Sequence, residues 1–192
     1  MNPLFEPRHP ALIRRLINEY PLAMLVSPRL HVSPLPLLAE PDAEGEVKAL
    51  FGHCARSNSL VADFAEDRRG LAIFSGPQGY ISPSLVSKPD WGPTWNHASL
   101  RFHVEVEFVP DETQRSVEQL AEKLEGDRWS LARLGARAEG MMAGIIAFRA
   151  WVTGTDHVLK LGQDESDQSH AEIVAAHPDR TLADWMIATR QR

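Results

Sequence analysis

The chain has 192 residues, of which 43% are hydrophobic and 24% are charged, so it suits one globular domain with a buried core. Its net charge of −6 argues against broad electrostatic binding to nucleic acid, because such binding requires a basic surface. A single cysteine, Cys54, excludes an intrachain disulfide and a thiolate metal cluster within one chain. No signal-peptide pattern and no apolar stretch of bilayer-spanning length is found. We therefore expect a cytoplasmic protein that does not bind membranes.

The first half of the sequence predicts one helix followed by short strands. Apolar residues at helical spacing predict an amphipathic helix over 10–20, closed by Pro21. Two prolines, Pro34 and Pro36, make 31–38 extended and restrict it to a sheet edge or a bulge. The glycines, prolines and serines of 75–84 predict tight turns. Compact apolar runs predict strands at 22–26, 47–51 and 71–74, and 57–66 predicts one or two helical turns.

The second half predicts the longest strand and the strongest helix. Apolar and polar residues alternate from Ala98 to Phe108, as in a half-buried antiparallel strand. The spacing of Val117, Leu120 and Leu124 predicts a helix over 112–125 that stops at Gly126. We further expect a buried strand over 140–152 and a last helix over 182–190. This mainly β pattern favours a small barrel with helices outside it, in one domain over 1–192 with a helical segment from about residue 165 onward.

The segment GHCARSN, residues 52–58, groups hydrogen-bonding side chains at the end of a predicted strand. The Arg56 guanidinium, with Ser57 and Asn58, forms a set that suits a phosphate, and backbone N–H groups of the next helix would add to it. A simpler interpretation is that Ser57 or Asn58 caps that helix while Arg56 is solvated. The segment alone therefore leaves both interpretations open.

Two further segments are unusual for a plain barrel. In FSGPQGYISPS, residues 74–84, glycines allow a close backbone approach, Tyr80 offers a ring, and Ser82 and Ser84 are donors. A β-turn with a tyrosine corner is the alternative. In WGPTWNH, residues 91–97, Trp95 offers a stacking surface beside the amide of Asn96, and a buried tryptophan at a strand start is the alternative. The histidines form no recognisable zinc motif.

Taken together and in this order, the three segments resemble the PaiB family, the FMN-binding negative transcriptional regulators. The family's segments read GHxARAN, FxGPxxYISPS and VPTWN, and LPLL at 35–38 and KLGQ at 160–163 also match its layout. This resemblance implies a split β-barrel of the pyridoxamine-phosphate-oxidase, FMN-binding type with peripheral helices. It also implies a homodimer with FMN in clefts between the two subunits.

The resemblance assigns residues by position. It places Arg56, Ser57 and Asn58 at the FMN phosphate and ribitol. The cleft would be lined, in part from the partner subunit, by His53, Tyr80, Ser82, Ser84, Trp95 and Asn96, with Lys160 and Gln163 from the C-terminal segment.

Some positions depart from the family pattern. Leu85 and Val86 replace a Trp-Tyr pair, Gly162 replaces a serine, and Asp164 and Glu165 stand where Asn-Arg is usual. On the strand after TWN, His97 and Arg101 stand where the family commonly has a tyrosine and then a histidine. An acid in place of an arginine near a phosphate opposes anion binding, so these departures predict FMN binding that is weakened or lost, with the pocket holding another flat anion or nothing.

Three functions remain open at this point. The chain is a flavin-binding regulator, an FMN-dependent oxidoreductase acting on a small molecule, or a haem-binding or haem-degrading barrel with His53, His97 or His103 as axial ligand. Acidic charge and the lack of a helix-turn-helix make direct DNA binding doubtful. The polar strand face that carries Arg101 and His103 could pair with its symmetry mate in a dimer, or be solvated in a monomer.

Overall fold

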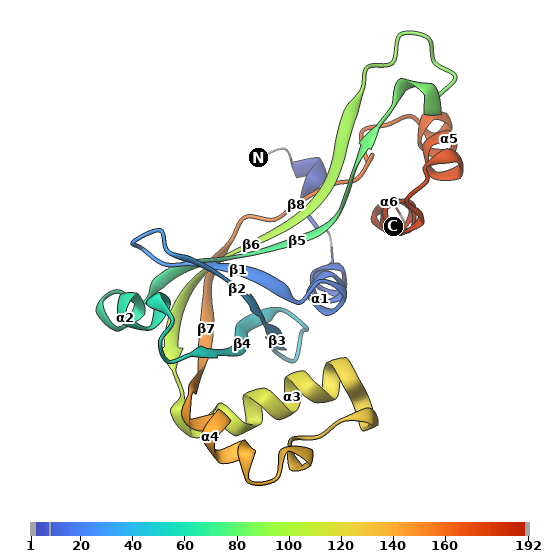
Figure 1. Ribbon diagram of the computed structural model, residues 1–192. Helices are drawn as coiled ribbons and strands as arrows, with labels where there is room; N and C mark the ends of the chain where they lie inside the picture. The colour runs from blue at the N-terminus through green and yellow to red at the C-terminus, as the bar shows by residue number, and fades with distance from the viewer. Residues whose placement is uncertain (1–2, 8, 191–192) are drawn as a thin grey trace.

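The computed structural model describes residues 3–7 and 9–190, and its strands form one antiparallel sheet. The sheet has eight strands in the order β2-β1-β5-β6-β7-β4-β3, and β8 pairs with β6 beside this path (Figure 1). The strands are β1 Leu22–Val26, β2 Val32–Pro36, β3 Leu38–Pro41, β4 Val47–Ala55, β5 Arg69–Ile81, β6 Thr94–Phe108, β7 Ile145–Thr155 and β8 Val158–Lys160. The predicted split-barrel architecture is confirmed.

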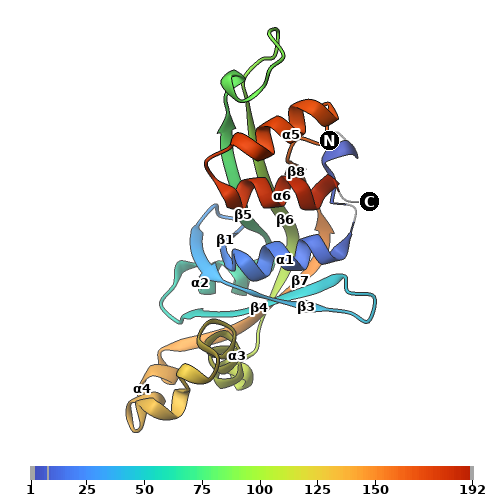
Figure 2. The same ribbon diagram turned by 90° about the vertical axis from the view of Figure 1, so that its right-hand side faces the viewer.

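Within the described residues, six α-helices lie outside the sheet. They are α1 Pro10–Glu19, α2 Ser59–Glu66, α3 Thr113–Glu125, α4 Arg137–Ala143, α5 Asp167–Ala176 and α6 Arg180–Arg190. Short 3-10 turns lie at Pro3–Phe5, Pro83–Leu85, Pro110–Glu112, Gly126–Arg128 and Leu131–Leu134. Figure 2 shows α5, α6 and α1 stacked on one side of the molecule, while α3 and α4 lie at the opposite end from α5.

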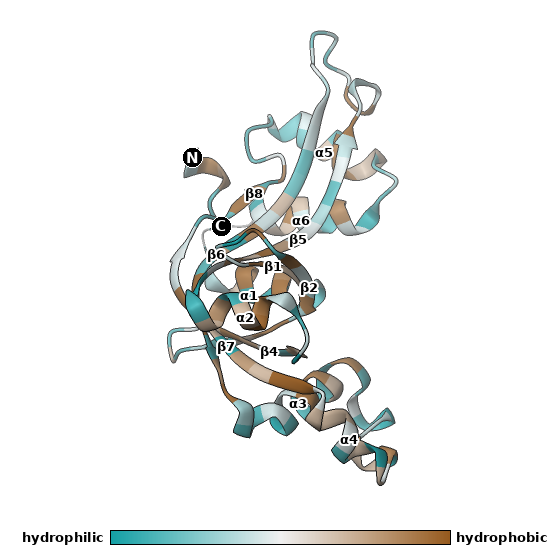
Figure 3. Cartoon of the chain, turned by 60° about the vertical axis from the view of Figure 1, so that its left-hand side comes forward, coloured by the Kyte–Doolittle hydropathy of each residue, from teal (hydrophilic) through white to brown (hydrophobic). Residues whose placement is uncertain are grey.

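The sheet curls on itself because its two end strands are consecutive in the chain. One residue, Leu37, joins β2 to β3, and its backbone N–H donates to the Pro21 carbonyl at 2.9 Å. The Leu37 side chain is fully buried, and alternate residues of each strand fill the barrel, including Phe74, Phe102 and Phe148. Figure 3 shows hydrophobic residues concentrated in these strands. As predicted, the prolines keep β2 at an edge, where it pairs only with β1 among the described strands.

Beyond the barrel, β5 and β6 continue as a long hairpin (Figure 1). We call its distal part, residues 76–81 and 94–98, the arm. Helices α5 and α6 cover one face of the arm, with Leu182 and Trp185 fully buried. A Cβ on Gly79 would lie 2.8 Å from Leu182 Cδ2, so this close approach of helix and strand requires glycine.

Most predicted elements are confirmed, and two predictions are wrong. The segment 75–81 is strand rather than tight turns, because a register shift between Ser75 and Gln78 accommodates Gly76 and Pro77 within β5. Residues 140–143 belong to α4 rather than to a strand, and β7 begins only at Ile145. The sequence of 140–144 is apolar on all sides, a pattern that does not separate a short helix from a strand.

Candidate functional site

Arg56 and Ser57 lie exposed in the turn between β4 and α2. The Arg56 backbone N–H donates to the Gly144 carbonyl at 3.0 Å, and its Nε donates to the Ala143 carbonyl at 3.1 Å. These bonds hold Arg56 against the end of α4 and fix the direction of its side chain. Its terminal nitrogens make no hydrogen bond to the described residues, so the guanidinium fork is available to an anion.

Asn58 is the N-cap of α2, as the simpler interpretation proposed. Its Oδ1 accepts from the Leu60 backbone N–H at 2.9 Å, and its Nδ2 donates to Ser33 Oγ at 3.0 Å. The side-chain amide is therefore engaged in holding α2 and β2 together. That leaves Arg56 and Ser57 as the free polar groups of this turn, which we call the phosphate loop (residues 56–58).

Two residues of β4 that precede the phosphate loop, His53 and Cys54, point elsewhere. His53 Nδ1 lies 2.9 Å from Ser116 Oγ on α3, and burial under that helix lowers the pKa of the imidazole. Cys54 faces the barrel core, and burial raises the pKa of its thiol to about 11. At neutral pH Cys54 is therefore a protonated core residue and not a nucleophile.

The arm presents two aromatic side chains on its uncovered face. Tyr80 and Trp95 are direct cross-strand neighbours with ring centroids 6.1 Å apart, and they are 50% and 52% exposed. Trp95 Nε1 donates to Gln78 Oε1 at 2.6 Å. Lys160 on β8 donates to the Trp95 carbonyl at 3.2 Å and to Thr94 Oγ1. We call Gln78, Tyr80, Trp95, His97 and Lys160 the aromatic face.

Asn96 lies on the opposite face of the arm from Trp95. Its side chain is buried, and its Nδ2 lies 3.6 Å from Met186 Sδ on α6. At the end of the arm, Ser82 Oγ and Ser84 Oγ lie 2.8 Å apart and cap the 3-10 turn. Gln163 Oε1 accepts from the Leu161 backbone N–H at 2.7 Å within its own loop. These four residues therefore shape the arm and its supporting loop.

Most of the positions that depart from the family pattern have structural roles, and Asp164 is the exception. Glu165 Oε2 accepts from Trp91 Nε1 at 2.8 Å and so connects the C-terminal segment to the end of the arm. Leu85 and Val86 pack against the hydrophobic core, and Asp164 is exposed. Gly162 has a positive φ of 83°, a conformation that glycine adopts without strain.

The structure thus sorts the predicted residues into two separate groups. Gly70 marks the point where β5 passes α2, because a Cβ on Gly70 would lie 3.0 Å from Phe64 of that helix. Tyr80 lies ten residues farther along the same strand. At the usual rise of a strand this is about 30 Å. Within one chain, the phosphate loop and the aromatic face therefore do not meet. The three histidines considered as haem ligands are also dispersed, with His53 under α3, His97 on the arm and His103 on the barrel.

Sequence reasoning missed two residues at these sites, Gln78 and Ser116. Gln78 lies two positions before Tyr80, which in a strand puts both side chains on one face. Because turns were predicted over 75–84, this relation between Gln78 and Tyr80 was not recognised. Ser116 is 63 positions from His53 and shares no motif with it. Only the packing of α3 on β4 brings the two together.

Known proteins are similar to this chain in sequence and in fold. A family model described as "Putative FMN-binding domain" matches residues 1–154. The chain belongs to this family. Protein PAI 2 of Bacillus subtilis strain 168, named a protease synthase and sporulation protein, is 26% identical over 132 residues. That alignment covers 65% of this chain and 62% of the relative, less than two thirds of its length. The predicted resemblance to PaiB is confirmed.

Solved structures with low sequence identity share the fold of this FMN-binding family. The flavocytochrome Anf3 from Azotobacter vinelandii aligns with a TM-score of 0.63 at 12% identity, over 84% of this chain and 72% of that one. A FAD and haem binding protein from Mycobacterium smegmatis aligns with a TM-score of 0.58 at 16% identity, over 86% and 77%. Among the described residues, no helix is long and apolar enough to cross a membrane.

Proposed function

We propose that this member of the FMN-binding family holds one FMN at each of two equivalent clefts between two copies of the chain. The observation that carries the proposal is that the phosphate loop precedes α2, whereas the aromatic face lies about 30 Å along β5 from Gly70, the strand position that contacts α2. One mononucleotide cannot touch both groups within a single chain. If the arm of one copy reaches the phosphate loop of the other, both groups contact the same flavin.

The phosphate loop fits the anionic end of FMN. The exposed guanidinium of Arg56 presents a fork of donors, and Ser57 adds a hydroxyl beside the start of α2. Arginine and a helix N-terminus are both favourable for phosphate. Asp164 and Glu165 follow β8 and lie in the C-terminal segment, so the acids that depart from the family pattern do not adjoin this loop in the chain.

The aromatic face fits the planar ring system. Tyr80 and Trp95 supply stacking surface, and the Gln78 amide and Lys160 ammonium supply polar groups at its margin. FMN, when bound, supplies the electron-transfer chemistry, while this chain binds and orients it. Gln78 fixes the Trp95 indole through its hydrogen bond, so this ring is already oriented before a flavin arrives.

The outer face of the sheet supports the two-copy arrangement. Met24 on β1 and Val32 on β2 are 43% and 54% exposed, and Met24 is the direct neighbour of Ile73 on β5. The neighbours of Ile73 and Leu71 on β6 are Arg101 and His103, so the polar positions predicted to pair in a dimer border this apolar surface. We name Leu22, Met24, Val32, Pro34, Leu71 and Ile73 the outer patch and propose it as the surface shared by two copies. Side chains alternate between the two sides of β6, so Trp95 and His97 of the aromatic face lie on the same side of this strand as Arg101 and His103.

The test is a titration of the full chain with FMN, followed by flavin fluorescence. We expect saturable binding by the natural chain and binding at least about 10-fold weaker by Arg56→Ala, because a charge-assisted phosphate contact is lost. Arg133→Ala, which removes an exposed arginine in the turn before α4, is the matched control. Equal affinity of Arg56→Ala and the natural chain would contradict the placement of the phosphate.

We further propose that any regulatory role acts through the flavin or a protein partner. A net charge of −6 disfavours contact with DNA phosphates. Specific promoter binding by the purified chain at physiological salt would overturn this view. Consumption of NAD(P)H by the FMN-loaded chain would instead identify an oxidoreductase.

A further inference from the structure

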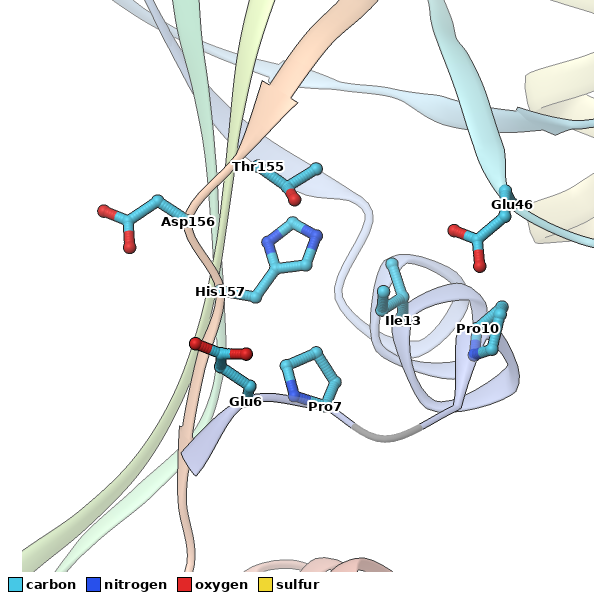
Figure 4. Close-up of a pocket in the computed structure, with 8 residues that line it drawn as sticks. All are labelled: Glu6, Pro7, Pro10, Ile13, Glu46, Thr155, Asp156 and His157. Atoms are coloured by element: carbon cyan, nitrogen blue, oxygen red, sulfur yellow. The ribbon is translucent and has the colours of Figure 1, made fainter. Parts of the chain in front are cut away.

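A cavity of about 390 Å³ lies between the N-terminal segment, α1 and the end of β7, away from the residues assigned to the flavin (Figure 4). Its apolar wall is formed by Pro7, Pro10 and Ile13. Its polar groups include Glu6, Glu46 and His157. A volume of this order is typical of sites for small organic molecules.

His157 supplies a buried donor that no described residue satisfies. The residue is 6% exposed, and its ring packs edge-on against Phe102 with centroids 4.6 Å apart. Its Nδ1 accepts from the Arg101 backbone N–H at 3.1 Å. Burial lowers the pKa of His157 to about 4, so the neutral ring carries its proton on Nε2.

The Nε2–H group has no hydrogen-bond partner among residues 3–7 and 9–190. Figure 4 shows this ring nitrogen directed into the cavity, toward the space between Thr155 and Ile13. Buried polar groups in folded proteins nearly always have a partner. The cavity therefore offers one fixed donor to an acceptor atom of a ligand.

Two carboxylates give the cavity its charge. Glu6 lies beside His157, and Glu46 turns its carboxylate toward Pro10 from the opposite wall (Figure 4). Neither carboxylate forms an ion pair with a described residue. Asp156 points the other way, and its Oδ2 lies 3.1 Å from Arg101 Nη2. Both carboxylates are exposed, and they favour a cation at the cavity although the Arg14 guanidinium donates to the Gly45 carbonyl next to Glu46.

We propose that this cavity binds a small organic cation that also carries a hydroxyl oxygen, of the amino-alcohol or amino-sugar class. The ammonium group pairs with the carboxylate of Glu46 or with that of Glu6 on the opposite wall, and the hydroxyl oxygen accepts from His157 Nε2–H. Pro7, Pro10 and Ile13 contact the carbon skeleton. An amine without an oxygen gains no hydrogen bond from His157 Nε2–H, and a neutral sugar gains no ion pair with either carboxylate.

The cavity contains none of the residues assigned to the flavin. His157 packs against Phe102 in the barrel interior, whereas Arg101 lies on the outer face of the sheet. Thr155, Asp156 and His157 also follow directly after the residues that match the family. The other five lining residues lie within residues 1–154, so the cavity combines the matched part of the chain with three residues that follow it.

The test is calorimetric titration of the full chain at neutral pH with glucosamine, glucose and cyclohexylamine. We expect saturable binding of glucosamine, and binding at least about 10-fold weaker of glucose, which lacks the ammonium, and of cyclohexylamine, which lacks the hydroxyls. The double variant Glu6→Gln/Glu46→Gln should lose glucosamine binding by a similar factor while FMN binding is unchanged. Glu44→Gln, in the same loop as Glu46, is the matched control.

A second readout uses the natural chain with ¹⁵N-labelled histidine. The His157 Nε2 resonance should shift on addition of glucosamine, because this nitrogen gains an acceptor. The proposal is overturned if glucosamine does not saturate the chain, if all three compounds bind alike, or if the double variant binds glucosamine undiminished. An unchanged His157 resonance at saturating glucosamine would also overturn it, whether or not the double variant folds.

Discussion

Asp63 of α2 anchors the turn between β1 and β2 through a single carboxylate. Its Oδ2 accepts from Ser27 Oγ at 2.6 Å and lies 2.7 Å from His31 Nδ1, and Arg29 Nε lies 3.9 Å from Oδ1. The hydrogen bond from Ser27, with further contributions from His31 and Arg29, lowers the pKa of Asp63 although burial opposes this. The charged form is therefore the one that stabilises the fold.

The lowered pKa of Asp63 predicts a pH dependence of stability. A carboxyl with a depressed pKa in the folded state stabilises the fold above its unfolded pKa of about 4, and this contribution is lost as pH falls through the folded value. Asp63→Asn should therefore lower Tm at pH 7, and the difference from the natural chain should shrink below about pH 4. Thermal unfolding across pH measures this, with exposed Asp184→Asn as control. If Tm changes with pH in the same way for Asp63→Asn and the natural chain, the lowered pKa of Asp63 is contradicted.

At the scale of elements, the start of α2 depends on one side chain. Asn58 satisfies the Leu60 backbone N–H and bonds Ser33 on β2. Asn58→Ala should therefore lower the free energy of unfolding by about 1 kcal/mol, while Asn58→Asp keeps the cap and costs less. Urea unfolding measures both variants. If Asn58→Ala leaves stability unchanged but abolishes FMN binding, the residue is a ligand contact and not a cap.

The arm depends on α6 for its rigidity. Leu182 is fully buried against Gly79, and His177 Nε2 lies 3.3 Å from the Tyr80 carbonyl. Leu182→Ala should cost about 2–5 kcal/mol of local stability, because it opens a cavity in this contact. Hydrogen exchange should therefore accelerate in 76–98 and not in 47–55. Ile187→Ala, on the exposed side of α6, is the control. Equal acceleration in both segments would show that the arm is not a separate unit.

Sequence patterns predicted elements well where one periodicity dominates. Alternation along 98–108 and helical spacing along 112–125 correspond closely to β6 and α3. The arm escaped prediction because Gly76, Pro77 and Gly79 resemble turn residues, yet each is tolerated by a bulge or a close helix. In the candidate site, motifs located Arg56, Tyr80 and Trp95. They could not reveal that Asn96 faces α6, since that depends on a helix about 90 positions away.

At the scale of the whole molecule, the two halves of the proposed site lie at different places on one chain. The phosphate loop lies at the β4–α2 turn, and the aromatic face lies on the arm. In the arrangement that we propose, two copies share the outer patch with twofold symmetry, and the arm of one copy reaches the phosphate loop of the other. Flavin binding then depends on assembly, so FMN affinity and self-association should vary together.

Subunit complementation tests this central claim most directly. Arg56→Ala lacks the phosphate contact and Trp95→Ala lacks the stacking surface, so each variant alone should bind FMN weakly. After the two are mixed, unfolded and refolded together, random pairing should restore about a quarter of the sites to natural affinity, because half of the pairs are mixed and each mixed pair holds one intact cleft. Recovery of that fraction in a fluorescence titration is the predicted result. A mixture that binds no better than the separate variants would contradict a flavin shared between subunits.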